Sequence, residues 1–300
     1  MSESVESFLL ACCYLLVITT VLGGIAYFFM ELQAKKIKTT LVRLDDIVKN
    51  RKKFTKTVRL ALMSDFHIPK MPPDSNLLLS AVSEASPDCV IIAGDLCESK
   101  KHWNETAELV GNIASECKCP VVIVLGNHDI QDACEKNTGK IKEYRRLLES
   151  VDKNVITLAD EKYVFECRGA ERTILFGGLN DFRYTSSGKI SDAVRKWHRE
   201  ASDGGAEFIL LSHNPDAALF VPDDCKPSVL LSGHTHAGQM WMPFNAEFRF
   251  LRKDTLPENG YKYGLHMYEG KFPIYITSGV GCSFLPIRYK STAEIAIIDI

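Results

Sequence analysis

The sequence has no excess of basic residues, no cysteine pairs with the spacing of a metal site, and no internal repeat. Lys and Arg number 36 against 38 Asp and Glu, which gives a net charge of −2 over 300 residues. Without a basic excess to neutralise phosphates, the composition excludes a general nucleic-acid binder. Most of the ten cysteines fall singly in apolar contexts, and Cys117-Lys-Cys119 has one spacer residue, not the two of a zinc knuckle. We therefore expect reduced thiols in a reducing compartment.

Charge is also missing from one long stretch near the N-terminus. Residues 8–30 contain no charged side chain. As a helix this stretch is about 35 Å long, which is enough to cross a hydrocarbon core of about 30 Å. A cleaved signal peptide needs a basic n-region, but the preceding residues carry Glu3 and Glu6, no Lys or Arg, and no twin arginine. We expect residues 1–34 to form a retained transmembrane anchor.

The basic residues around this stretch predict its orientation. None precedes it, and several follow it closely, namely Lys35, Lys36, Lys38 and Arg43. The positive-inside rule then predicts a single-pass protein of the inner (cytoplasmic) membrane with the C-terminal bulk in the cytoplasm. Residues 35–57 are expected to be a basic juxtamembrane linker that rests on anionic headgroups, or a solvated linker with a short helix, or both. Residues 58–300 are expected to be the catalytic domain.

Apolar strands alternate with helix-compatible segments from residue 58 onward. Predicted strands cover 58–63, 88–93, 120–125, 173–177, 207–211, 229–231, 274–277 and 292–298, and predicted helices cover 76–86, 103–117, 140–150 and 191–201. Continuous apolar strands between helices indicate an α/β fold whose strands are covered on both faces. The last two strands follow one another without a helix between them, so we expect a mixed sheet.

Most of these strands end at Asp, Asn or His. Five of the eight histidines follow a predicted strand, namely His67, His128, His213, His234 and His236. In extended chain, residues i and i+2 point the same way, so His234 and His236 can face one site. One polar residue at a strand end is usually a turn former. The repetition favours a ligand site, because ligands bind beyond the carboxyl ends of strands in α/β sheets.

The donor types at these strand ends predict the chemistry. Carboxylate, amide and imidazole donors without thiolate suit Mn²⁺, Fe, Zn²⁺ or Mg²⁺. There are enough donors for two ions that share one carboxylate. Two ions about 3.5–4 Å apart can bind a phosphate oxygen between them and activate the attacking water. The sequence therefore predicts a hydrolase of phosphate esters or anhydrides.

The order and spacing of the motifs from residue 61 to residue 236 resemble the calcineurin-like metallophosphoesterase superfamily. The motifs are Asp65-x-His67, Gly94-Asp95, Gly126-Asn127-His128-Asp129, His213 and Gly233-His234-Thr235-His236. This resemblance implies a sandwich of mixed β-sheets flanked by helices and two divalent ions, with Mn²⁺ expected first and Fe, Zn²⁺ or Mg²⁺ as alternatives. It implies that the first ion is held by Asp65, His67, Asp95 and His236. The second would be held by Asp95, Asn127, His213 and His234, with Asp95 bridging the two.

The resemblance also implies roles for two neighbouring residues. His128 would contact the scissile phosphate and stabilise or protonate the leaving group, and the alternative is a hydrogen-bonding role behind the ligands. An imidazole can do the first because it can donate to a phosphoryl oxygen that gains charge. Asp129 is expected to orient its neighbours without binding a metal.

Further segments are similar to the membrane-associated bacterial branch of that superfamily. They are residues 234–239, 261–264 and 278–283, followed by Pro286-Ile-Arg288. This branch includes chlamydial-type UDP-2,3-diacylglucosamine pyrophosphatases of lipid A biosynthesis. The resemblance implies hydrolysis of that nucleotide-lipid to UMP and lipid X (2,3-diacylglucosamine 1-phosphate), with no obligate protein partner. Alternatives are a generic membrane-associated phosphodiesterase, a phospholipid phosphatase, or an inactive metal-binding scaffold. Some relatives carry a twin-arginine or cleaved signal, which this chain lacks.

Two segments rich in aromatic and basic residues follow the last histidine motif. Residues 240–244 read Met-Trp-Met-Pro-Phe, and residues 248–253 read Phe-Arg-Phe-Leu-Arg-Lys. Such a mixture can take acyl chains or enter the membrane interface, or it can pack onto the domain as a long loop. Guanidinium groups match phosphate oxygens in pairs, which makes Arg249, Arg252 and Arg288 candidate contacts for a pyrophosphate.

Overall fold

The computed structural model describes residues 3–48, 56–131, 138–167, 172–181, 185–250 and 254–300. Two six-stranded sheets carry the fold. The strands of the first, in spatial order, are β1 (Ile37–Arg43), β12 (Ala293–Asp299), β2 (Arg59–Met63), β3 (Cys89–Ala93), β4 (Val121–Val124) and β5 (Val155–Leu158). Those of the second are β10 (Gly264–Tyr268), β11 (Phe272–Ile276), β9 (Val229–Ser232), β8 (Glu207–Leu211), β7 (Arg172–Gly178) and β6 (Glu161–Cys167).

Both sheets are mixed, as expected. Strands β2 to β5 run parallel, while β12 pairs antiparallel with β2. In the second sheet β7, β8, β9 and β11 run parallel, and β6 and β10 are antiparallel edge strands. The parallel strands of each sheet therefore deliver their carboxyl ends to a common edge, where the connecting loops gather.

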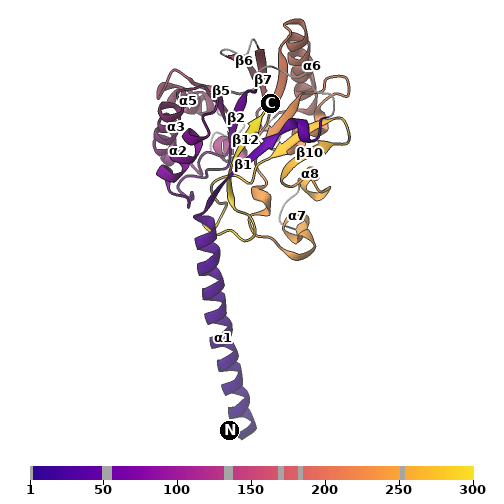
Figure 1. Cartoon of the computed structure of the whole chain (residues 1–300). Helices are drawn as coiled ribbons and strands as arrows, with labels where there is room; N and C mark the ends of the chain where they lie inside the picture. Colours follow the sequence, from indigo (N-terminus) through magenta and orange to yellow (C-terminus); the bar gives the residue numbers. More distant parts are fainter. Residues whose placement is uncertain (1–2, 49–55, 132–137, 168–171, 182–184, 251–253) are drawn as a thin grey trace.

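The sheets pack face to face, with helices on both outer faces. One buried apolar cluster joins side chains of both sheets, including Leu62, Ile91, Phe176 and Leu231. Helices α2 (Ser75–Glu84), α3 (Trp103–Cys117) and α5 (Thr138–Ser150) cover the first sheet, and α6 (Ser187–Asp203) and α8 (Thr255–Glu258) pack on the second. Figure 1 shows these helices on opposite sides of the strands. The predicted mixed sandwich with flanking helices is confirmed.

Short helices occur in the loops between these strands and helices. They are η1 (Leu44–Asp46), η2 (Lys100–His102), α4 (Asn127–Gln131), η4 (Pro215–Phe220), η5 (His236–Gly238), η6 (Pro243–Asn245) and α7 (Ala246–Phe250). Helix α4 begins directly after β4, and η5 begins at the second histidine of the His-x-His motif.

The expected linker is in part a strand of the domain. Strand β1 pairs in parallel with β12 from Ile37–Ala293 to Arg43–Asp299. Val42 and, after the strand, Leu44 are buried. The linker prediction was therefore wrong for this segment, because its pairing partner lies more than 250 residues away and leaves no local signal. Residues 49–55, which hold four of the nine basic side chains of the predicted linker, lie outside the described residues.

Helix α1 (Glu3–Ala34) is long and apolar enough to cross a membrane, judged by length and composition. Residues 4–34 have a mean hydropathy of 2.4 over the most apolar window, and none of that window is buried by the rest of the protein. Figure 1 shows α1 extending away from the sandwich on its own. The exposed apolar surface of this helix agrees with the predicted anchor at residues 1–34.

Candidate dinuclear metal centre

The predicted ligands meet at one end of the sandwich. Asp65 and His67 follow β2, and Asp95 follows β3. Asn127 and His128 begin α4 after β4. The remaining three, His213, His234 and His236, follow β8 and β9. These loops belong to both sheets, and their imidazole and carboxylate atoms form three overlapping groups, each within 4.8 Å. All three groups are buried except for His128, which is half-buried.

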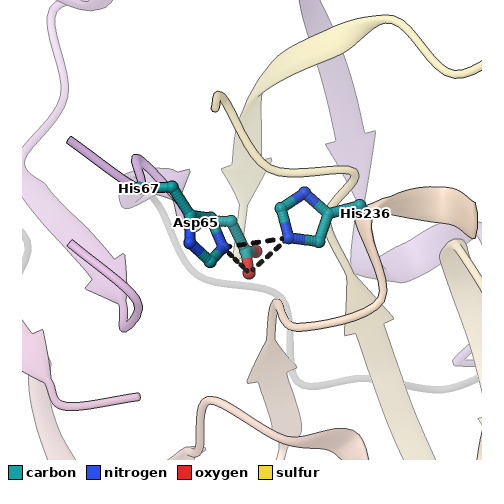
Figure 2. A group of neighbouring side chains, drawn as sticks. All are labelled: Asp65, His67 and His236. Carbon is teal, nitrogen blue, oxygen red and sulfur yellow. Dashed lines mark hydrogen bonds and ion pairs between the residues drawn. The ribbon is translucent and has the colours of Figure 1, made fainter. Parts of the chain in front are cut away.

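The first group consists of Asp65, His67 and His236. His236 Nε2 lies 3.3 Å from Asp65 Oδ1 and 3.1 Å from His67 Nε2. His67 Nε2 lies 3.8 Å from the same Asp65 oxygen. Figure 2 shows both rings turned toward the Asp65 carboxylate. Two imidazole nitrogens and a carboxylate oxygen therefore converge on one small volume, as the ligands of one ion would.

The second group consists of Asp95, His213 and His234. His213 Nε2 lies 3.1 Å from Asp95 Oδ2 and 3.1 Å from His234 Nδ1. The same Asp95 oxygen lies 3.6 Å from His67 Nε2 in the first group. Asp95 thus stands between the two groups, in the position that a bridging carboxylate requires.

The outer nitrogens of three histidines are already occupied. His67 Nδ1 contacts Glu98 Oε1 at 2.6 Å, and His213 Nδ1 donates to the Ala93 carbonyl at 2.7 Å. His234 Nε2 lies 3.2 Å from both oxygens of Asp254. In each ring the remaining nitrogen faces the cluster. Metal-binding histidines show this pattern, because the outer contact fixes the tautomer and the ring orientation.

Two buried oxygens give a second test of whether the residues fit metal ions. Within the described part of the chain, Asp65 Oδ1 and Asn127 Oδ1 are buried and accept no hydrogen bond. A buried polar atom without a donor costs about 1–3 kcal/mol, and a cation would remove that cost. Oxygen and imidazole donors without thiolate suit divalent ions of hard or borderline character. The residues present therefore fit two divalent ions.

The backbone at the site is strained. Five of the seven candidate ligands have a positive φ, namely Asp65 (57°), His67 (49°), Asp95 (55°), His234 (72°) and His236 (51°). The left-handed region costs a non-glycine residue roughly 1–3 kcal/mol, and it persists only where surrounding structure holds it. The concentration of this strain on one set of side chains is typical of a functional site.

Close packing of the loops holds this backbone in place. A Cβ atom at Gly126 would lie 2.8 Å from Asp95 Cγ, and one at Gly233 would lie 2.7 Å from Asp65 Oδ2. Both residues must therefore be glycine for the neighbouring loops to lie this close together. Asp129 accepts hydrogen bonds from the backbone of Leu96, Cys97 and Gly126, which joins the loop after β3 to the loop after β4.

The carboxylates and imidazoles of the site shift one another's pKa values. Burial opposes the charged form of His213, but Asp95 outweighs it and raises the pKa of that imidazole to about 10. Burial likewise opposes charge on His67, and its contacts with Asp65 and Glu98 raise its pKa to about 9. The pKa of Asp95 falls well below its usual value, because His213 outweighs burial. The carboxylates are thus anionic and favour a cation between them.

His128 is the most exposed member of the three donor groups. Its side chain is 27 % exposed, whereas that of His67 is 1 % exposed. The His128 ring lies edge-on to His67 with 4.7 Å between centroids, and Nδ1 lies 3.7 Å from Glu98 Oε2. Burial lowers the pKa of this histidine. His128 therefore lies at the opening of the site, although His67, Asp95 and His128 are also close enough to share an ion.

The three candidate arginines are placed differently. Arg288 is fully buried, and its guanidinium donates to the carbonyls of Ser278, Gly279 and Gly281. The expected contact of Arg288 with a pyrophosphate is therefore wrong, because its donors support the loop behind Asp65. Arg249 lies exposed on α7. Arg252 lies outside the described residues.

Sequence reasoning missed two carboxylates that contact the candidate ligands. Glu98 contacts His67 and lies three residues after Asp95, so its place in the same loop was a usable signal. Asp254 contacts His234 from a loop twenty residues away in sequence, and it also accepts a hydrogen bond from Asn214 at 3.2 Å. No motif spacing predicted that residue.

Comparison with known proteins identifies relatives over the same region. The calcineurin-like phosphoesterase family model matches residues 58–238, which contain all the candidate ligands. A Danio rerio protein named as a transmembrane protein with a metallophosphoesterase domain is 30 % identical over 80 % of this chain and 52 % of its own length. An uncharacterized metallophosphoesterase of Helicobacter pylori is 25 % identical over 90 % of this chain and 65 % of its own length. The phosphodiesterase YaeI of Escherichia coli is 25 % identical over 81 % of this chain and 82 % of its own length. The chain thus spans between half and two thirds of the first two relatives.

Proposed function

Because the chain belongs to the calcineurin-like phosphoesterase family, we propose that it is a metal-dependent hydrolase of phosphate esters or anhydrides that acts at a membrane. The observation that carries this proposal is the pair of buried donor groups joined through Asp95, whose Oδ2 lies 3.1 Å from His213 and 3.6 Å from His67. Two divalent ions held there, with Mn²⁺ proposed first, would offset the charge of a bound phosphate and activate the attacking water.

Residues of the chain would supply the positioning and the proton transfer that the reaction also needs. The two donor groups hold their geometry through the outer contacts of His67, His213 and His234, so little reorganisation is needed when a phosphate binds. His128 stands at the opening, where its ring can donate to a phosphate oxygen and give a proton to the leaving oxygen. Glu98, 3.7 Å from His128 Nδ1, orients that ring.

The specific substrate that we propose is UDP-2,3-diacylglucosamine, cleaved to UMP and lipid X. This proposal is supported by the resemblance of residues 234–239, 261–264 and 278–288 to the membrane-associated bacterial branch, and by the apolar helix α1. The pyrophosphate of this substrate would need a cation other than the buried Arg288, and the exposed Arg249 is the candidate. We further propose the cytoplasmic face of the inner membrane, on the basis of the basic residues that follow α1.

A second candidate function is supported by a relative. YaeI is named a phosphodiesterase, so hydrolysis of a simpler phosphodiester or of a phospholipid headgroup is the alternative activity. In that case small water-soluble diesters should be good substrates. An inactive scaffold is the remaining alternative, but it does not account for the position of His128 at the opening of the site.

The deciding experiment measures turnover by the full chain purified in detergent. UDP-2,3-diacylglucosamine and a soluble aryl phosphodiester are compared after treatment with EDTA and after Mn²⁺ is added back. Release of UMP that Mn²⁺ restores, much faster than diester cleavage, is the expected result. Diester cleavage without UMP release would exclude the nucleotide-lipid as the substrate. No turnover of either compound would favour the inactive scaffold.

Two variants separate catalysis from metal binding in the same assay. Asp95→Ala is expected to abolish turnover together with bound metal, because it removes the bridging ligand. His128→Ala is expected to lower turnover by about 10²–10⁴-fold with both ions retained, as measured by elemental analysis. Loss of metal from the His128 variant would identify that residue as a ligand and contradict its proposed role.

A further inference from the structure

Large apolar side chains are exposed on two loops beside the metal centre. Outside α1, the three most exposed large apolar side chains in the described residues are Phe244 (87 %), Phe284 (87 %) and Phe250 (82 %). Trp241 and Leu285 are 45 % and 53 % exposed. We name residues 241–250 and 283–290 together the two-loop patch. Exposed apolar side chains gathered in this way mark an interaction surface.

The two loops form one continuous surface. Trp241 N donates to the Tyr289 carbonyl at 3.1 Å, and Tyr289 N donates to the Gln239 carbonyl at 2.9 Å. The buried Gln239 side chain donates to the carbonyls of Ser283, Leu285 and Ile287 at 3.0–3.1 Å and accepts from Ser283 N at 2.8 Å. These bonds hold the tip that carries Phe284 in a fixed position relative to Trp241.

The backbone holds two of the phenylalanines in an unusual conformation. Phe244 has a φ of 59°, and Phe284 has a φ of 56°. A bulky residue rarely adopts this left-handed region unless the surroundings impose it. Neither side chain gains burial in the domain in return, so the strain presents them outward.

The patch lies where α1 leaves the domain. Arg288 N donates to the Met30 carbonyl at 3.1 Å, and Met30 is the last residue of the uncharged stretch 8–30. The loop of residues 283–290 is therefore level with the end of the apolar part of α1. Figure 1 shows α7 and the yellow C-terminal loops on the side of the sandwich from which α1 extends.

Cations accompany the aromatic side chains. Lys290 Nζ lies 4.3 Å from the centroid of the Trp241 ring and 5.6 Å from that of Tyr289. Arg249 is exposed next to Phe250. Trp and Tyr beside Lys and Arg are typical of the membrane–water interface, where rings lie at headgroup level and cations meet lipid phosphates.

We propose that the two-loop patch rests in the interfacial region of the bilayer that α1 crosses, so that its partner is membrane lipid. The patch adjoins the metal centre, because Ser283 Oγ lies 3.1 Å from His236 Nε2 and the next residue is Phe284. The domain is thereby held with its site next to the headgroups. The consequence that lipid-linked phosphates are the substrates rests on the proposed function, whereas the docking itself does not.

The three tryptophans of the chain provide the test. Trp103 and Trp197 are buried in the domain, and Trp241 is exposed in the patch. The full chain is reconstituted in vesicles of phosphatidylcholine and phosphatidylglycerol with or without lipids that carry a spin label at the headgroup or high on the acyl chain. With either label, the tryptophan fluorescence of the wild type is expected to lose the part contributed by Trp241. The fluorescence of Trp241→Phe is expected to be the same with and without labelled lipid.

Two further variants test the surface without altering the reporter. Phe244→Ser combined with Phe284→Ser leaves Trp241 in place and is expected to abolish the quenching. Val164→Ser, on edge strand β6 at the opposite end of the sandwich from α1 (Figure 1), removes an exposed apolar side chain elsewhere and is expected to retain it. An unquenched wild-type chain, or equal quenching in the double variant and the control, overturns the proposal.

Turnover of the soluble aryl phosphodiester is measured on the same samples to separate the two proposals. Quenching without turnover would leave the membrane surface standing and remove the proposed activity. Turnover without quenching would do the reverse. The double variant is expected to keep wild-type turnover of the soluble diester, because both phenylalanine side chains are 87 % exposed.

Discussion

At the scale of single residues, the candidate ligands are held by carboxylates and carbonyls outside the cluster. The contact between His67 Nδ1 and Glu98 is the shortest of these, at 2.6 Å. Burial favours the neutral form of Glu98, but His67 outweighs it and lowers the pKa of Glu98 to about 2. Glu98 therefore remains anionic and keeps His67 Nε2 pointed at the first metal position.

The first prediction concerns this contact. Glu98→Gln keeps the size of the side chain but replaces a charged acceptor with a neutral one. Since contacts of this kind are worth about 10–100-fold in metal affinity or activity, we expect the Mn²⁺ concentration needed for half-maximal diester turnover to rise by a factor in that range. Titration of metal-stripped protein measures it, and saturating Mn²⁺ should recover much of the activity.

The matched control is Glu116→Gln, which changes an exposed glutamate on α3. Its Mn²⁺ titration should coincide with that of the wild type. A Glu98 variant that titrates like this control would show that His67 needs no anionic partner.

The sequence predicted the inner residues of the site better than the outer ones. His234 and His236 were predicted from their spacing in a chain taken to be extended. Both have a left-handed φ instead, and they belong to different donor groups. Asp254 was not predicted, because its contact with His234 arises only in the folded chain. Arg288 was misassigned because a buried guanidinium that supports a loop and an exposed one that binds phosphate are identical in sequence.

At the scale of secondary structure, strands buried on both faces were predictable and edge strands were not. Strands β3 and β4 are buried at every position, so their apolar runs are continuous. Strand β1 reads Ile-Lys-Thr-Thr-Leu-Val-Arg and was taken for part of a linker. Such a strand is stabilised by its pairing with β12, which no local pattern encodes.

The second prediction tests whether β1 and its continuation belong to the domain. Leu44 is fully buried, whereas Leu41 is 52 % exposed. Leu44→Ala should cost about 2–5 kcal/mol of unfolding free energy, which corresponds to a Tm lower by roughly 5–15 °C. Leu41→Ala is the control and should stay within about 0.5 kcal/mol of the wild type. Thermal melts in detergent compare them, and coincident melts would restore residues 35–57 to the role of a linker.

At the scale of the whole molecule, the metal centre connects the two sheets. Asp65 and Asp95 come from the first sheet, and His213, His234 and His236 come from the second. Each donor group combines residues of both sheets. An ion bound by such a group cannot remain coordinated if either sheet unfolds, so metal binding and the stability of the whole sandwich are linked.

The last prediction follows from this linkage. A ligand that binds only the folded state at 100 times its dissociation constant adds about 2.7 kcal/mol, so each ion should raise the Tm by roughly 5–10 °C for a domain of this size. Removal of metal with EDTA should reverse the rise within a single transition. Asp95→Ala should abolish the shift, because this side chain serves both positions. His102→Ala alters a histidine of η2 whose ring contacts Glu105 at 3.2 Å, and it should keep the full shift. A full metal-dependent shift in the Asp95 variant would mean that the ions bind elsewhere, since Asp95 belongs to the second donor group and lies 3.6 Å from His67 in the first.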